Sequence, residues 1–184
     1  MRRLVGMQVL GATTIRAVES RDLEATRRWR NDPRIWGPAL GRRFPIVESG
    51  ERAWFEHLGS GAFPTQVVWT IADDADSAVG LVRLDDIHWI HRTAMFGIWI
   101  GPEHWGTGHA GRATRLVRDH AVSSLGLRQV RLEVLVGHDA ARSVYLNNGF
   151  VDEGLLRGAV LLDGRHHDLH LMVYHAPPPL QASS

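Results

Sequence analysis

The feature that most constrains the fold is a change in the spacing of apolar residues between residues 93 and 136. Residues 93–100 are β-rich, apolar side chains over 113–125 fall at helical spacing, and residues 128–136 alternate apolar with polar. A strand, a helix and a second strand in this order form a parallel crossover when both strands join one sheet. The sequence therefore predicts a parallel strand pair crossed by one helix.

The rest of the chain adds mostly antiparallel strands to this unit. Segments 67–72, 79–84 and 93–100 are separated by short polar turns, which favours an antiparallel meander. Further elements are expected as a strand at 14–18, helices at 20–30, 48–58 and 139–148, and strands near 150–156 and 167–174. We expect an α+β fold with a mixed, mostly antiparallel seven-stranded sheet and about four helices.

Length and composition limit the number of domains and the classes of function. At 184 residues, with 44% apolar and 22% charged, the chain should form one domain over 1–176, followed by a flexible tail over 177–184. The net charge of +1 argues against nucleic acid as a main partner. The domain should fold alone or as a small oligomer, such as a homodimer.

Several absences narrow the chemistry. Without cysteine there are no disulfides, no thiolate zinc sites and no cysteine nucleophile. No apolar run is long enough to span a membrane, and the first residues lack the apolar core of a secretion signal, so a cytoplasmic location is expected. Met7 is an alternative start to Met1.

Residues 27–43 carry six arginines and one acidic residue, Asp32. This cluster indicates either a solvated basic face or a site for an anion.

The sharpest local feature is a small-residue turn between a strand and a helix. It consists of Trp105, Gly106, Thr107, Gly108, His109, Ala110 and Gly111. Small residues at a helix start let backbone N–H groups close on a phosphate, and the positive end of the helix dipole adds to the attraction. The turn therefore predicts a site for a diphosphate.

The glycines of this turn also match the G-x-G-x-x-G spacing of dinucleotide-binding folds. However, residues 102–105 separate the strand from the first glycine, and Glu133, about twenty residues on, lies in mid-strand. The mostly antiparallel surroundings leave no room for a second mononucleotide-binding half. Nicotinamide binding is therefore the weaker interpretation.

Together with other motifs, the turn resembles the GNAT acetyltransferases. Residues 105–110 fit the family's Q/R-x-x-G-x-G/A signature except at Trp105, a substitution common in the branch similar to ribosomal-protein N-acetyltransferases. That branch also tends to show Trp-Arg-Asn-Asp-Pro, here residues 29–33, and Gly-Arg-x-x-Asp, here residues 164–168. The resemblance spans about residues 13–174. It implies a GNAT fold with a splayed parallel strand pair and transfer of an acetyl group from acetyl-CoA to a primary amine.

The resemblance also implies where acetyl-CoA binds. In the family the pantetheine arm adds like a strand along the segment matching Ile98, Trp99 and Ile100, and the turn at 105–111 takes the diphosphate. Gly97 is expected to form a bulge that opens this edge, or else to accommodate a bulky neighbour. Position 138, where the family usually has Asn to hold the pantetheine, is His138.

Tyr145 corresponds to the family's tyrosine that protonates the departing thiolate. A phenol with a pKa of about 10 is neutral at neutral pH and can donate a proton to a thiolate. Taken alone, Tyr145 would be interpreted as a core tyrosine, because buried tyrosines are common. The spacing to Gly149 and Phe150 favours the catalytic role.

Glu133 is the candidate base, twelve residues before Tyr145. A partly buried carboxylate could accept the proton that an ammonium must lose before it attacks. The alternative is a salt bridge with Arg131 or Arg165. Position 95, often glutamate in related sequences, is Met95, and Asp86 and His88 are weaker substitutes.

The acceptor side is less defined. Trp36, Asp86 and Trp89 are candidates for lining the acceptor site, although tryptophans of this kind are also ordinary core residues. His166, Asp168 and His170 share one strand face, but we expect no metal site. The acceptor is expected to be a protein N-terminus or a small-molecule amine, and the alternative function is a non-catalytic acyl-CoA-binding module.

Overall fold

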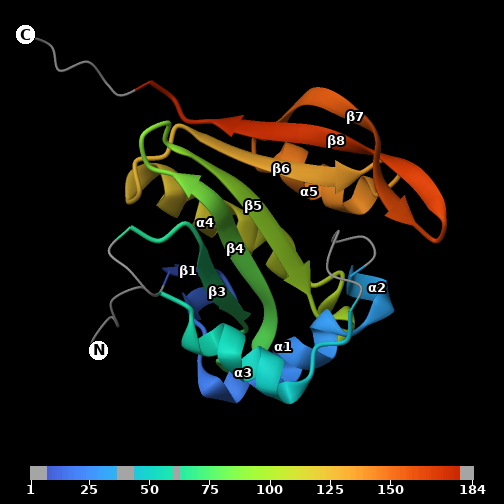
Figure 1. Cartoon of the computed structure of the whole chain (residues 1–184). Coiled ribbons are helices and arrows are strands. Elements are labelled where there is room, and N and C mark those ends of the chain that lie inside the picture. Colours follow the sequence, from blue (N-terminus) through green and yellow to red (C-terminus); the bar gives the residue numbers. More distant parts are fainter. Residues whose placement is uncertain (1–7, 37–43, 60–62, 179–184) are drawn as a thin grey trace, which may run out of the picture.

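The structure is a computed structural model that describes residues 8–36, 44–59 and 63–178 (Figure 1). Within these residues one mixed sheet of eight strands runs in the order β1-β2-β3-β4-β5-β6-β8-β7. The expected α+β class and mostly antiparallel sheet are confirmed, with eight strands in place of seven. The choice of Met1 or Met7 as start, and most of the tail at 177–184, fall outside the described residues.

The first half of the sheet is antiparallel throughout. It contains β1 (Gln8–Leu10), β2 (Thr13–Ala17), β3 (Val67–Ala72), β4 (Ala78–His88) and β5 (Thr93–Ile100). Strand β1 is the additional strand. The turn expected over residues 85–92 is shorter than predicted because β4 continues to His88, which pairs with Thr93. The register shifts between Asp85 and His88, where Asp86 has a φ of 49°.

The crossover has the predicted form. Helix α4 (His109–Ser123) connects β5 to β6 (Gln129–Leu135), and the two strands pair in parallel. Pairing covers only Thr93 with Gln129, Ala94 with Val130 and Met95 with Arg131. Beyond Met95 the strands diverge, as the ribbons of Figure 1 show. The expected splayed parallel pair is confirmed.

The second half of the sheet follows α5 (Asp139–Asn147). It is formed by β7 (Val151–Leu162) and β8 (Arg165–His175), with β8 between β6 and β7. Strand β7 is longer than the expected segment 150–156 because a register shift between Leu156 and Val160 lets pairing resume. Asp163 and Gly164, with φ of 49° and 75°, form the two-residue hairpin turn.

The N-terminal helices lie together at one end of the sheet (Figure 1). They are η1 (Ser20–Asp22), α1 (Leu23–Arg30), α2 (Pro33–Trp36) and α3 (Glu48–Glu56), so the helix expected at 20–30 begins with a 3-10 turn. Trp29 of α1 is buried against Gly101, where an added Cβ would lie 2.5 Å from the indole nitrogen. None of the helices among the described residues is long and apolar enough to cross a membrane.

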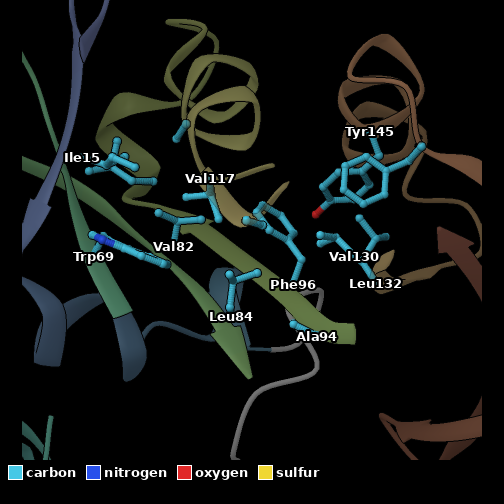
Figure 2. Close-up of a cluster of buried hydrophobic side chains, with 14 of the residues drawn as sticks. Ile15, Trp69, Val82, Leu84, Ala94, Phe96, Val117, Val130, Leu132 and Tyr145 are labelled. Carbon is cyan, nitrogen blue, oxygen red and sulfur yellow. The ribbon is translucent and has the colours of Figure 1, made fainter. Parts of the chain in front are cut away.

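The main core lies between the sheet and helices α4 and α5 (Figure 2). Alternation along the strands sends Val82, Phe96 and Leu132 to this side, where they are 0%, 6% and 1% exposed. Helix α4 contributes Val117, also fully buried. Burial of apolar area of this kind is the largest favourable contribution to folding.

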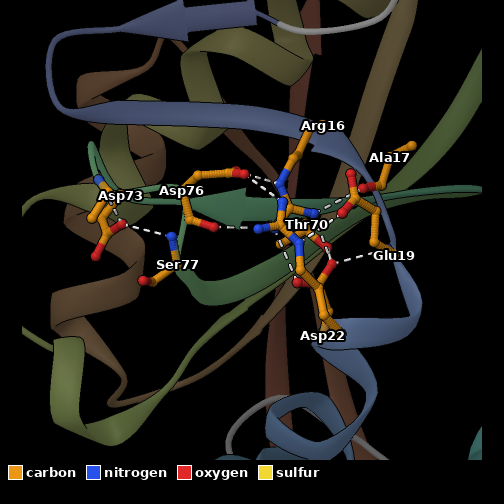
Figure 3. Close-up of polar contacts among 10 residues, drawn as sticks. Arg16, Ala17, Glu19, Asp22, Thr70, Asp73, Asp76 and Ser77 are labelled. Atoms are coloured by element: carbon orange, nitrogen blue, oxygen red, sulfur yellow. Dashed lines mark hydrogen bonds and ion pairs between the residues drawn. The ribbon is translucent and has the colours of Figure 1, made fainter.

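A buried ion pair ties β2 to the start of the helical region (Figure 3). Arg16 donates two hydrogen bonds to the Asp22 carboxylate, at 2.8 and 3.0 Å, and Thr70 Oγ1 donates another at 2.8 Å. Burial would raise the pKa of Asp22, but the bonds from Arg16 outweigh it and hold that pKa below its usual range. Because both charges are paired, the polar cluster can be buried beside the sheet.

Candidate functional site

The glycine turn leads from the end of β5 into α4. The 3-10 turn η2 (Pro102–His104) precedes it, and residues 105–108 are exposed. Gly106 and Gly108 have φ of 77° and 80°, in the left-handed region that favours glycine, and Gly108 is the N-cap of α4. The first amides of a helix have no partner within the helix, so those of α4 are available to an anion.

Side chains around the turn hold its shape. The Trp105 indole N–H donates to the carbonyl of Ile100 at 2.8 Å, and Thr107 Oγ1 donates to the carbonyl of His104 at 2.6 Å. From the helix, Arg112 Nη2 donates to the carbonyl of Thr107 at 2.9 Å. The turn is therefore fixed before any ligand arrives, which lowers the entropic cost of binding.

His109 contributes its backbone to the turn, while its side chain points into the protein. The imidazole is buried, and its Nδ1 lies 2.9 Å from Thr13 Oγ1, which in turn accepts a bond from Arg112 Nε at 2.6 Å. Because the hydroxyl accepts from Arg112, its proton is available to Nδ1. Burial, and then the charge of Arg112, lower the pKa of His109. The side chain thus fastens α4 to β2 as a neutral group.

The edge of β5 beyond Met95 faces the divergence from β6. Ile98, Trp99 and Ile100 lie on this part of β5, after the last parallel pair. The bulge expected at Gly97 is wrong, because the register with β4 is unbroken from Gly80 to Asp85. Gly97 instead accommodates a neighbour, since a Cβ there would lie 2.8 Å from Arg83 Nε. The edge opens because β6 turns away.

Tyr145 lies on α5 and is 9% exposed. Its ring meets Phe96 and Phe150 with centroids 6.1 and 6.0 Å apart. Its hydroxyl points toward Phe96 of β5 and Val130 of β6 (Figure 2). Burial raises the pKa of Tyr145 to about 12, so the phenol stays protonated at neutral pH.

Glu133 projects from β6 away from the core, opposite to Leu132 and Val134, as alternation predicts. Its side chain is exposed rather than partly buried. Among the described residues neither Arg131 nor Arg165 forms an ion pair with it, and Arg131 instead donates to Gln129 Oε1 at 2.6 Å. The salt-bridge alternative is therefore absent from the described structure. His138, the N-cap of α5, is half-buried.

The three candidate acceptor residues are not brought together by the described structure. Asp86 is exposed at the β4 irregularity. Trp89 packs against the core and Phe63, and its indole N–H donates to the carbonyl of Pro64 at 3.2 Å. Both precede the start of β5, whereas the glycine turn follows its end. Trp36 ends α2, and its side chain is outside the described part.

Two polar residues near the site escape prediction from the sequence. Asn148, at the end of α5, is 5% exposed, and its buried Oδ1 has no hydrogen-bond partner among the described residues. Arg83 of β4 lies over Gly97. The sequence offers no local signal for either, because each role depends on pairing between distant segments. In the possible zinc set, Asp168 accepts from the Gly158 amide and His166 contacts the Gly158 carbonyl, so both side chains bind the backbone of β7. The described residues hold no group of side chains arranged for a metal.

Comparison with known proteins decides the family. A model described as an acetyltransferase (GNAT) domain matches residues 13–151. The chain belongs to the GNAT acetyltransferase family. This confirms the resemblance inferred from the glycine turn and its companion motifs.

Spermidine acetyltransferase relatives match this chain over nearly its whole length. Spermidine N(1)-acetyltransferase of Vibrio cholerae is 30% identical over 159 residues, which cover 86% of this chain and 90% of the relative. Its crystal structure with CoA and spermine has a TM-score of 0.83 and 28% identity, covering 90% of this chain and 96% of that one. Ribosomal-protein-serine acetyltransferase of Escherichia coli is 29% identical over 52% of this chain and 54% of the relative.

These findings confirm the predicted reaction class. The protein is a GNAT N-acetyltransferase that uses acetyl-CoA as co-substrate and transfers the acetyl group to an amine. Nothing in the comparisons supports the alternative of a non-catalytic acyl-CoA-binding module.

Proposed function

We propose that the backbone amides of residues 106–111 bind the diphosphate of acetyl-CoA, and that the edge of β5 at Ile98, Trp99 and Ile100 pairs with its pantetheine arm. The proposal is supported by the left-handed glycines at the start of α4 and by the loss of parallel pairing beyond Met95. A 15-residue helix with open N-terminal amides suits an anion, and an unpaired strand edge suits an extended amide chain. Two side chains are candidates to help bind the pantetheine arm. His138 occupies the position where the family usually has Asn, and Asn148 lies near α4.

We assign Tyr145 as the general acid. The observation that carries this role is the direction of its hydroxyl, toward Phe96 and Val130, close to the last parallel pair of β5 and β6 (Figure 2). The attacking amine forms a bond from nitrogen to the thioester carbon, and the carbon–sulfur bond then breaks. Tyr145 donates its proton to the sulfur that leaves, and solvent returns a proton to the phenolate.

Glu133 is our candidate for the base. Had parallel pairing continued past Met95 and Arg131, residue 133 would stand opposite Gly97, so Glu133 flanks the divergence on the face away from the helices. There its carboxylate can take the proton that the amine loses, directly or through one water. Trp36 stays a candidate for the acceptor side, while the positions of Asp86 and Trp89 favour structural roles.

The acceptor is a primary amine of either a protein N-terminus or a small molecule. Both classes are supported by relatives, since one is named for spermidine and another for a ribosomal protein. The experiment is a thiol-release assay with acetyl-CoA and an amine panel, with products checked by mass. Release that depends on the amine, with a matching gain of one acetyl group, is expected. Coenzyme A binding without amine-dependent release would contradict the proposal.

Two further predictions concern the setting of the enzyme. A homodimer stays a prediction. A Vibrio cholerae relative is dodecameric; it is 29% identical, with a TM-score of 0.77, and the match covers 90% of this chain and 95% of that one. Light scattering of the purified chain measures its assembly. The cytoplasmic location also stays a prediction.

A further inference from the structure

The amine must reach the divergence of β5 and β6 from the face opposite α4 and α5. On the helix side this region is closed by core residues, with Ala94, Phe96 and Leu132 at most 6% exposed. On the other face Met95 and Gly97 are half-exposed and Glu133 is exposed. Side chains on that second face therefore meet the acceptor first.

Arg83 occupies the centre of this face. The register pairs it with Gly97, and its side chain lies so close that a Cβ at Gly97 would meet Nε at 2.8 Å and Cγ at 3.3 Å. Its guanidinium carbon is 5.4 Å from the centroid of the Trp99 ring, a cation–π contact. These two contacts fix a positive charge over the middle of β5, while 39% of the side chain is exposed.

The donors around Arg83 are incompletely used. Asp85 Oδ2 lies 2.8 Å from Arg83 Nε, close enough for an ion pair, but the N–H direction does not make a hydrogen bond, and Nε is buried with no hydrogen-bond partner among the described residues. The buried Trp99 indole nitrogen also has none there. Asp85 meanwhile accepts from Gln66 Nε2. Both nitrogens are buried, so an oxygen-bearing ligand would contact the exposed part of the Arg83 side chain rather than Nε or the indole.

Charges on this face divide into two groups. Arg83 and its ion-pair partner Asp85 come from β4, while Arg131 and Glu133 come from β6 across the divergence. An amine placed near Glu133 would bring any oxygen on its neighbouring carbon toward the β4 side. A polyamine, by contrast, would bring further ammonium groups toward a fixed guanidinium. The arrangement suits a ligand with one positive end and an oxygen close to it.

We infer that Arg83 is a specificity-determining residue that contacts a carboxylate or carbonyl oxygen next to the amine, so that α-amino groups are preferred over polyamines. This inference rests on the proposed acetyl transfer on that face. Both a free amino acid and a peptide N-terminus carry the required chemistry. A charge-assisted hydrogen bond from a planar guanidinium contributes about ten- to hundredfold in affinity.

Calorimetry on the CoA-saturated chain tests the inference without requiring turnover. The ligands are L-alanine, the peptide Ala-Gly-Gly, spermidine and propylamine, each titrated into the parent, Arg83→Gln and Arg83→Lys. Arg131→Gln is the matched control, since it removes a cation from the same face on β6. Thermal unfolding of each variant checks folding.

Arg83→Gln should weaken the better of the two α-amino ligands about tenfold or more and leave propylamine unchanged. Spermidine should bind several-fold tighter, because Asp85 is freed. Arg83→Lys should weaken the α-amino ligand but still disfavour spermidine, and Arg131→Gln should leave the ratios unchanged. If alanine binds and the peptide does not, the source is a free amino acid, and the reverse result indicates an N-terminus.

A parent chain that prefers spermidine, or equal effects of Arg83→Gln on all four ligands, would overturn the inference while leaving acetyl transfer intact. Should Arg83→Gln not fold, a spermidine preference in the parent, or unchanged ratios in Arg83→Lys, decides against it equally. Failure of the parent to bind coenzyme A would instead overturn the proposed function, and the role of Arg83 with it.

Discussion

The ring of Tyr145 meets the ring of Phe96 edge-on, with 6.1 Å between centroids and 83° between planes. Phe96 belongs to β5 and Tyr145 to α5, so this contact joins the strand proposed to hold pantetheine to the helix that carries the proposed acid. Aromatic pairs of this geometry add stability beyond the area they bury. The contact holds the phenol in place while its hydroxyl points toward Phe96 and Val130 (Figure 2).

Tyr145→Phe should therefore lower kcat without unfolding the chain. Loss of a general acid typically costs about 10²- to 10⁴-fold in rate. The KM for acetyl-CoA should change little, because the ring and its packing remain. Thiol-release kinetics measure both. Tyr174→Phe is the matched control, since Tyr174 is the other of the two tyrosines and also packs on Phe150. Equal losses in the two variants would contradict the assignment.

Alkaline titration should separate the two tyrosines. The chain has no cysteine and all 21 of its Lys and Arg residues are arginine, so tyrosines are the side chains that ionise between about pH 9 and 12. Burial raises the pKa of Tyr145 to about 12. Phenolate absorbance should therefore show one step that is missing from Tyr145→Phe and centred near pH 12.

The raised pKa of Tyr145 also determines how the folding stability changes with pH. Between about pH 10 and 12 the unfolded chain loses the Tyr145 proton while the folded chain keeps it, so stability falls as pH rises through this window. Below pH 10 both states are protonated and the effect vanishes. A Tyr145 step near pH 10 would show that the hydroxyl is more solvated than its burial indicates.

Gly106→Ala should weaken coenzyme A binding. Gly106 has a φ of 77°, and an added Cβ would meet nothing within 4 Å, so strain and hindrance to the ligand are the expected effects. Gly126→Ala is the matched control, with a φ of 67°, no neighbour within 4 Å and a place at the other end of α4. Both should lose about 1 kcal/mol of stability.

Calorimetry should find that Gly106→Ala alone lowers coenzyme A affinity, by about tenfold or more, because the methyl group and the strained backbone displace amides from the diphosphate. Unchanged affinity in both variants would exclude Gly106 from the binding site.

Glu133→Gln should slow acetylation of amines that are protonated at neutral pH, by about 10²-fold. With an acceptor that is mostly neutral at the assay pH, such as an alkoxyamine, the loss should be small, because no proton has to be removed before attack. Thiol release with both acceptors gives the ratio. Glu24→Gln, at an exposed site on α1, is the control. Equal loss with both acceptors would assign Glu133 another role.

Much of the fold was predictable because the spacing of apolar residues along the sequence indicates the main strands and helices. The alternation over 128–136 and the helical spacing over 113–125 give β6 and α4, and the glycines at 106 and 108 mark the turn between strand and helix. Strand β1 was not predicted because three residues are too few to show an alternation of apolar and polar side chains. The extension of β7 depends on a register shift that no local pattern encodes.

Parts of the candidate site follow from the spacing of residues in the sequence, and other parts depend on strand register. The turn at 105–111 and Tyr145 belong to motifs with fixed separations. Arg83 and Gly97 are fourteen residues apart, and only the β4–β5 pairing brings one over the other. The packing of Trp89 against Phe63 likewise does not follow from the sequence, where a tryptophan in a polar turn resembles a binding residue.

A crystal structure of the chain with coenzyme A would show where the diphosphate and the sulfur bind. We expect the diphosphate on the amides of residues 106–111 and the sulfur within about 3.5 Å of the Tyr145 hydroxyl, between β5 and β6. A diphosphate bound elsewhere, or a sulfur far from Tyr145 with the turn filled by protein side chains, would contradict this expectation.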